Sequence, residues 1–246
     1  MKYEGLSPAE LAARLRTPCC LALPKVTSTL DIIHEMAAEG APAQTLVLAD
    51  EQAAGRGRYG RTWHSPKGAG VWLGYLLRPS EPPEGGVVAL RVGLALVGAL
   101  GAMGVRAQLK WPNDVVSRDR KLSGVLCETR WMGQIVSWVA VGIGINVHGP
   151  VPPGLADQAV TLEEIRPGST RLDMLETLIP RLQAISATPT LTDDERHDYL
   201  EHDWLSQRQI VEPVTGESCG IDPDGALLVK TASGIERVVG GSVVAA

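Results

Sequence analysis

The chain of 246 residues is 44% hydrophobic and 21% charged, a balance that excludes a disordered chain and predicts a folded globular protein. Its formal net charge of −5 argues against general binding of nucleic acid, and its four cysteines form neither a zinc-site spacing nor a C-x-x-C redox motif. No signal peptide is recognised, so we expect a reduced, cytoplasmic protein with one large domain and one small one.

The N-terminal third is predicted to contain two helices and two strands. The apolar pattern places them over residues 8–16, 28–39, 45–49 and 71–77. Ser7 and Ser28 are typical helix N-caps, and Ser28 with Asp31 resembles a capping box. Because a helix-turn-helix needs two packed helices, the single short helix before residue 20 predicts no such DNA-binding motif.

The run from Val87 to Val105 is long and apolar enough to resemble a membrane span. It contains Arg91 and four glycines, and an arginine at the middle of a bilayer costs about 2.5–3.5 kcal/mol. We therefore predict a helix buried in the protein core and no membrane segment.

The remaining sequence predicts strands in runs with helices between them. Strands are expected over residues 108–111, 115–116, 122–129 and 135–147, a loop over 149–154, and helices over 171–186 and 193–204. This order is typical of a mixed β-sheet flanked by helices, in the α+β class. After Ser206 four short strands separated by turns, over 209–214, 217–221, 226–231 and 236–239, predict a small β-barrel.

The segment from Gly55 to Pro66, here called the arginine loop, reads G-R-G-R-Y-G-R-T-W-H-S-P. Glycine disfavours helices and strands, and three arginines do not bury unpaired. Guanidinium groups bind carboxylate or phosphate, glycine lets backbone N–H groups approach a ligand, and the indole of Trp63 offers a face for a flat ring. We predict a flexible loop that closes over a small anion with a flat part, such as a nucleotide. A solvated surface loop is the alternative.

The glycines of the arginine loop also spell G-x-G-x-x-G, the fingerprint of dinucleotide-binding sites. That fingerprint opens a helix directly after a strand and is followed by an acidic residue about 20 residues on. Here Pro66 and the glycines after it prevent a helix, and five residues separate the strand at 45–49 from Gly55. The context therefore argues against a Rossmann site.

Three further motifs place cations, amides and glycines beside strands. K-W-P-N-D, from Lys110 to Asp114, supplies a point charge for phosphate or carboxylate and polar groups that orient a ligand or hold a metal. A turn with a solvated lysine is the alternative. Lys121 and Gly124 follow in a strand that glycine opens to close approach. The strand G-I-G-I-N ends in Asn146, whose amide suits the edge of adenine.

Taken in order, the motifs G-R-G-R-x-G-R-x-W-x-S-P, K-W-P-N-D, K-L-x-G-x-L and G-I-G-I-N-V resemble the biotin–protein ligases from about Ser28 to Val147. The β-rich tail, with Gly220-Ile221-Asp222 and Gly240-Gly241, is similar to the C-terminal domain of that family. The resemblance implies a class II synthetase-like catalytic domain over residues 1–205 and an SH3-like β-barrel over 206–246.

The resemblance also implies the residues of the site. It assigns biotin binding to Ser28, Thr29, Gln52, Gly55, Arg56, Gly57, Arg58, Lys110, Gly124 and Gly144. It assigns ATP or adenylate binding to Arg58, Arg61, Trp63, Lys110, Asn113, Lys121 and Asn146, and Mg²⁺ to Asp114. Because two anions must be brought together, catalysis is assigned to Lys110, Arg56 and Arg58. The family usually has asparagine where Leu30 stands, so one polar contact to biotin is missing.

The implied reaction activates biotin with ATP to biotinyl-5′-AMP, releases pyrophosphate, and transfers biotin to a lysine of a biotin carboxyl carrier protein. Many family members carry an N-terminal DNA-binding domain. Here the motifs begin near residue 28, so we expect a monomer or homodimer without that domain and without a nucleic-acid partner. A lipoate or octanoate ligase or transferase of the same fold remains an alternative. A non-catalytic biotin-binding regulator is another, but a pure binder does not need Lys110.

Overall fold

A computed structural model describes residues 1–149 and 151–246. Seven strands form one sheet in the order β1-β2-β3-β7-β6-β5-β4, with β1 and β2 parallel and the other pairs antiparallel. The strands are β1 (Cys20–Leu23), β2 (Leu46–Ala49), β3 (Gly70–Leu77), β4 (Gln108–Lys110), β5 (Asp114–Ser117), β6 (Arg120–Met132) and β7 (Ile135–Asn146). This mixed sheet confirms the predicted α+β class.

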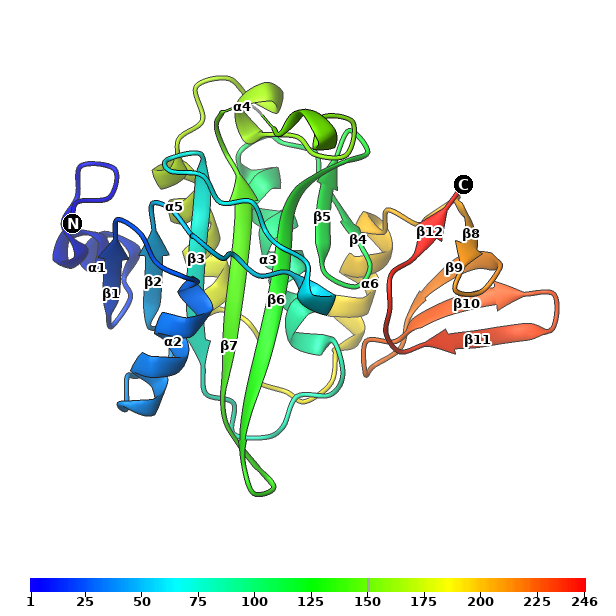
Figure 1. The fold of residues 1–246 in the computed structure, drawn as a ribbon. Helices are drawn as coiled ribbons and strands as arrows, with labels where there is room; N and C mark the ends of the chain where they lie inside the picture. Colours follow the sequence, from blue (N-terminus) through cyan, green and yellow to red (C-terminus); the bar gives the residue numbers. More distant parts are fainter. Residues whose placement is uncertain (150) are drawn as a thin grey trace.

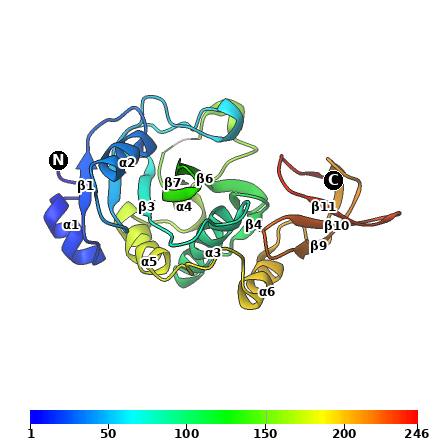
Figure 2. The same cartoon turned by 90° about the horizontal axis from the view of Figure 1, so that it is seen from below.

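Helices cover both faces of the sheet (Figures 1 and 2). One face carries α3 (Val87–Ala102), α5 (Arg171–Gln183) and α6 (Asp193–His202), and the main hydrophobic core lies beneath α3 and α5. The other face carries α2 (Thr29–Ala38), which buries a smaller apolar cluster, and the arginine loop. The short elements are α1 (Pro8–Leu15) beside β1, η1 (Arg58–Gly60), η2 (Pro153–Leu155) and α4 (Leu162–Ile165).

The predicted N-caps begin α1 and α2, with one difference. Ser7 forms a reciprocal capping box with Glu10, and the Ser28 hydroxyl accepts a hydrogen bond from the backbone N–H of Leu30 at 3.3 Å. The expected capping box between Ser28 and Asp31 is absent from the described contacts because the Asp31 carboxylate pairs with Arg56 instead. Asp31 therefore pairs with the arginine loop and does not cap its own helix.

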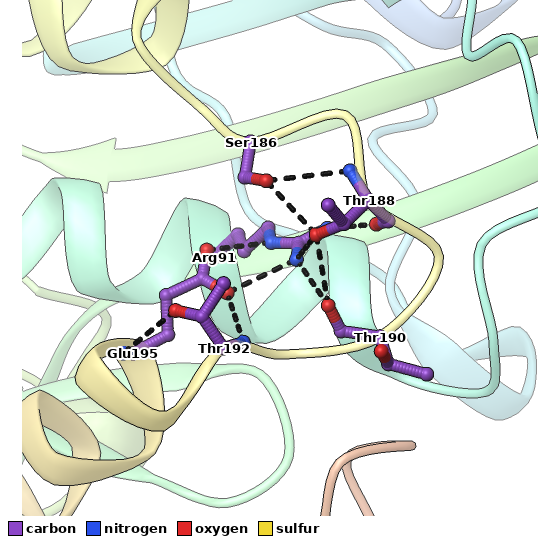
Figure 3. A network of polar contacts seen from close by, with 6 residues as sticks. All are labelled: Arg91, Ser186, Thr188, Thr190, Thr192 and Glu195. Atoms are coloured by element: carbon purple, nitrogen blue, oxygen red, sulfur yellow. Dashed lines mark hydrogen bonds and ion pairs between the residues drawn. The ribbon is translucent and has the colours of Figure 1, made fainter.

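The apolar helix α3 is buried in the core, as predicted, and its one arginine is fully paired. The Arg91 side chain, 3% exposed, donates to the Glu195 carboxylate at 2.6 Å and to the backbone carbonyls of Thr188 and Thr190 at 2.6 Å each (Figure 3). These contacts fasten the connection between α5 and α6 to α3. Within residues 1–149 and 151–246, no helix combines the length and apolar content needed to cross a bilayer.

The C-terminal segment folds as a five-stranded antiparallel sheet in the order β11-β10-β9-β8-β12, which confirms the predicted SH3-like module. Its strands are β8 (Gln209–Glu212), β9 (Gly216–Ile221), β10 (Leu227–Thr231), β11 (Gly234–Val238) and β12 (Val244–Ala245). The module lies next to α6 (Figure 1), where Ser218 donates to the buried Asp203 carboxylate at 2.7 Å. Sequence periodicity missed three short elements, β1, β12 and α4. The loop predicted over 149–154 contains Pro150, which lies outside the described residues.

Candidate active site

Two adjoining cavities open on the α2 face of the large sheet. The first, of about 240 Å³, lies between the N-terminus of α2, the arginine loop and the strands β6 and β7. The second, of about 570 Å³, lies beside it toward the end of β7. Both cavities are lined by Arg61, Thr62, Trp63, Lys110, Asp114 and Lys121. The shared wall makes them two compartments of one site, with room for two ligands that meet.

Most of the residues predicted from the motifs lie around the first compartment. These are Ser28, Thr29, Gln52, Arg56, Gly57, Arg58, Arg61, Trp63, Lys110, Asn113, Asp114, Lys121, Gly124 and Gly144. Asn146 lines the second compartment instead. Gly55 lines neither: it is buried at the base of the loop, and its carbonyl accepts from the Trp63 N–H at 2.8 Å. The sequence reading missed Ser242 and Val243, which reach the first compartment from the C-terminal module.

A buried polar cluster forms the end of the first compartment at the start of α2. The amide oxygen of Gln52 accepts from the backbone N–H of Thr29 at 2.9 Å and from its hydroxyl at 3.2 Å. The amide nitrogen of Gln52 donates to the Ser65 hydroxyl at 2.8 Å. Ser28 and Thr29 are almost fully buried. Because these groups already hold one another in place, the cavity presents oriented hydroxyl and amide groups to a polar ligand.

The arginine loop folds as a tight hairpin in this structure, and its flexibility stays a prediction. Its backbone closes through a hydrogen bond from the Gly57 N–H to the Arg61 carbonyl at 2.7 Å, and Arg56 and Thr62 form a β-bridge. Tyr59 has a φ of 56° within the turn η1. The glycines on either side give the chain the freedom to make this turn.

The arginines of the loop differ in how their charges are compensated. Arg56 pairs with the carboxylates of Asp31 and Glu128, and the Glu128 contact is 3.1 Å long. Arg58 donates to the amide oxygen of Asn113 at 3.1 Å and lies over the ring of Tyr59 at 4.9 Å. These partners of Arg58 are neutral, so its charge remains available to an anion, whereas Arg56 is already matched by two carboxylates.

The two lysines of the site differ in the same way. The Lys121 ammonium pairs with the Asp114 carboxylate at 2.7 Å. The Lys110 ammonium forms no hydrogen bond or ion pair with any residue that the structure describes, although it lines both compartments. Burial lowers the pKa of Lys110, and the nearby Asp114 carboxylate opposes that shift. The positive charges of Lys121 and Arg208 lower the pKa further. Among the described residues Lys110 thus has no direct ion-pair partner, and in this sense it is an uncompensated cation at the junction of the two compartments.

The side chains that the structure describes do not form a metal site on their own. Across residues 1–149 and 151–246 there is no group of three or more His, Cys, Asp or Glu side chains placed to hold a metal ion. Asp114, the predicted ligand, is occupied by Lys121. Mg²⁺ is usually held by one or two carboxylates together with substrate phosphates. These residues therefore fit Mg²⁺ only when a bound nucleotide supplies phosphate oxygens.

Trp63 lies flat against the sheet because two strand glycines leave room for it. Gly124 and Gly144 face each other across β6 and β7. A Cβ atom on Gly144 would stand 2.4 Å from the indole nitrogen of Trp63, and one on Gly124 would stand 2.9 Å from its ring carbon Cζ3. The indole N–H is buried without a hydrogen-bond partner among the described residues. The ring thus lines both compartments, while its N–H faces the sheet.

Comparison with known proteins agrees with this geometry. Residues 22–146 match the model of the biotin/lipoate A/B protein ligase family, and residues 211–244 match that of the biotin protein ligase C-terminal domain. A biotin–[acetyl-CoA-carboxylase] ligase of Paracoccus denitrificans is 35% identical over 223 residues, which cover 80% of this chain and 88% of that protein. The bifunctional ligase/repressor BirA of Bacillus spizizenii is 32% identical over 238 residues, which cover 87% of this chain and 70% of that protein.

A solved structure extends the likeness to the whole fold. The biotin protein ligase from Aquifex aeolicus in complex with biotin and ATP has a TM-score of 0.77 and 28% identity, over 92% of this chain and 98% of that one. Both parts of the chain, the mixed sheet with its two compartments and the small C-terminal sheet, are therefore those of one family. The chain belongs to the biotin/lipoate A/B protein ligase family and, within it, to the biotin protein ligases.

Proposed function

We propose that this protein is an ATP-dependent biotin–protein ligase that makes biotinyl-5′-AMP and transfers biotin to a lysine of a biotin carboxyl carrier protein. The observation that carries this proposal is the uncompensated ammonium of Lys110, which lies where the two compartments meet. A reaction that joins two anions needs a cation at their junction more than it needs a nucleophilic side chain.

Each compartment suits one of the two substrates. We assign biotin to the first compartment. Its lining includes the hydroxyl groups of Ser28 and Thr29 and the amide of Gln52, which suit the polar ureido ring of biotin. We assign ATP to the second, where Trp63 offers a ring face. Asn146 lines it too; its amide nitrogen is held by backbone carbonyls at 3.3 Å, so its oxygen is the group left for adenine. Gly55 lines neither compartment, so we assign it a structural role at the base of the arginine loop.

The chemistry then follows from the positions of the cations. A carboxylate oxygen of biotin attacks the α-phosphorus of ATP, the bond to the β-phosphate oxygen breaks, and pyrophosphate leaves. Lys110 and Arg58 stabilise the negative charge that accumulates at this point. The amine of the carrier lysine then attacks the biotinyl carbonyl, loses a proton, and AMP leaves. The folded arginine loop excludes water from the mixed anhydride until the carrier arrives.

Several finer features belong to the same proposal. Mg²⁺ would enter with the nucleotide and lower the charge on its phosphates, close to Asp114. The boundary between the catalytic and C-terminal domains is placed at residues 205 and 206, which the two separate sheets support. The protein acts in the cytoplasm as a monomer or homodimer. The net charge of −5 supports the absence of a nucleic-acid partner.

Pyrophosphate–ATP exchange on the purified protein tests the proposal. We expect exchange that depends on biotin, and biotinylation of a carrier protein when both are present. Exchange with lipoate or octanoate but not with biotin would identify the related ligase activity instead. Biotin binding without any exchange would identify a non-catalytic regulator.

A further inference from the structure

The Lys110 ammonium lies over an aromatic ring, and the carboxylate of its cross-strand neighbour Asp114 pairs with Lys121. Its Nζ atom is 4.3 Å from the centre of the Trp204 ring. Trp204 is 9% exposed and lines the second compartment together with Lys110. A desolvated ammonium over an indole face is stabilised by the ring's quadrupole. Unlike a carboxylate, the ring carries no formal charge, so it holds the ammonium without cancelling the field that an incoming anion feels.

Three contacts fix the ring of Trp204 at this place. Its backbone N–H donates to the Leu109 carbonyl at 2.9 Å, directly beside Lys110 on β4. Its indole N–H donates to the Asp119 carboxylate at 2.9 Å, which sets the rotation of the ring. The guanidinium of Arg208 lies 4.3 Å from the ring centre and also pairs with Asp119. A buried tryptophan needs partners for both N–H groups, and here those partners also set the ring beside Lys110.

The residue before Trp204 connects this arrangement to the C-terminal module. The Asp203 carboxylate is buried and accepts from the hydroxyl of Ser218 in β9 at 2.7 Å, from the Tyr199 hydroxyl at 3.1 Å, and from the Leu205 N–H at 2.8 Å. Asp203 also forms a β-bridge with Leu109. The end of α6 is thus held by the small sheet on one side and by β4 on the other.

We propose that Trp204 is a positioning residue that holds the ammonium of Lys110 at the junction of the two compartments with its charge uncompensated. Through Asp203 and Ser218, the C-terminal module thereby fixes the place of the cation that the adenylation step requires. This inference rests on the proposed function, because it takes Lys110 as the cation that binds the adenylate.

A double-mutant cycle between Trp204 and Lys110 tests the inference. The measurement is the affinity for a non-hydrolysable biotinyl-adenylate analogue, determined by titration calorimetry on folded protein. We expect Trp204→Leu to weaken binding about tenfold when Lys110 is present, and less than about twofold in the Lys110→Ala background. Trp204→Phe retains a ring face and should stay within about threefold of the wild type.

Two results would overturn the inference. Equal losses from Trp204→Leu with and without Lys110 would show that Trp204 acts through packing alone. Equal losses from Trp204→Leu and Trp204→Phe would show that the ring face is irrelevant. Should the leucine variant fail to fold, Trp204→Met takes its place, since methionine fills irregular core space. A third outcome, in which the wild-type protein does not bind the analogue at all, would refute the proposed function. The failure of the inference and the failure of the proposed function can therefore be told apart.

Discussion

Two cations, the buried Arg91 and the half-buried Lys110, lie on opposite sides of the large sheet and have different surroundings. Arg91 in α3 is matched by the Glu195 carboxylate and by backbone carbonyls, and it connects two helices (Figure 3). Lys110 in β4 lies over Trp204 and has no carboxylate partner among the described residues. A cation that serves the fold is fully compensated, because an unpaired buried charge costs several kcal/mol. Lys110 is only half-buried, so it bears a smaller part of that cost, and a bound anion would relieve it.

This comparison predicts the largest loss of stability for Arg91→Met. The change removes the cation that pairs with the Glu195 carboxylate and the donor to two backbone carbonyls, and breaking a buried pair from one side costs about 3–5 kcal/mol. Urea unfolding at 25 °C measures the free energy. Exchange activity per folded molecule should remain near that of the wild type, since Arg91 lies outside both compartments. A loss below about 1 kcal/mol would contradict the structural role.

Lys110→Ala should greatly lower activity and change stability little, which is the reverse of the pattern expected for Arg91→Met. Losing one preorganised charge contact costs about 2.7–4 kcal/mol in the transition state, which is a drop of about 100- to 1,000-fold in kcat for biotin-dependent exchange. The free energy of unfolding should fall by no more than the roughly 0.5–2 kcal/mol of the contact with Trp204, because no ion-pair partner is left behind. Lys110→Met is the matched control, since it keeps most of the side-chain volume without the charge. Exchange near the wild-type rate in either folded variant would remove Lys110 from its role.

The sequence was sufficient for the composition of the site but not for the state of its charges. The resemblance to the biotin–protein ligases, carried by the order of the motifs, predicted that Ser28, Gln52 and Lys110 belong to one site, and all three line the first compartment. It could not show that Arg56 meets Glu128, which lies 72 residues away. Such pairings depend on how the arginine loop lies over β6 in the folded chain, which no local pattern encodes.

The fold shows the same difference between features set by local sequence patterns and features set by distant contacts. Long apolar runs such as α3 and β7 were predicted because periodicity extends over many residues. β1 was missed because its four residues are held by pairing with β2, at the register Cys20 to Leu46, rather than by a pattern of their own. The role of Trp204 was missed too, since its contact with Lys110 bridges 94 residues of sequence.

Arg58→Gly should make the enzyme release its intermediate. Arg58 tethers the arginine loop to Asn113 in this structure, and its charge is available to the adenylate. A charge-assisted hydrogen bond contributes about 1.5–3 kcal/mol, and another glycine raises the entropy of the open loop. Adenylate should still form through Lys110 but escape about 10- to 100-fold faster. Streptavidin blotting of albumin incubated with biotin, ATP and the variant measures this escape. Bystander labelling no greater than with wild type would contradict it.

Glu128→Gln should have the smallest effect and completes the comparison of compensated and free cations. Arg56 is matched by carboxylates as Arg91 is, but its side chain is 37% exposed, and pairs open to water contribute about 0.2–1 kcal/mol. Asp31 remains as a partner after the change, so adenylate formation should stay within about threefold of the wild-type rate. The glutamine keeps the shape of the side chain and an oxygen that can still accept from His34, whose Nε2 lies 2.8 Å from the carboxylate. The matched control is Asp31→Asn, which removes the other partner of Arg56 and should have an effect of similar size. A loss of exchange as large as that of Lys110→Ala would show that the position of Arg56, and not only its charge, governs the reaction.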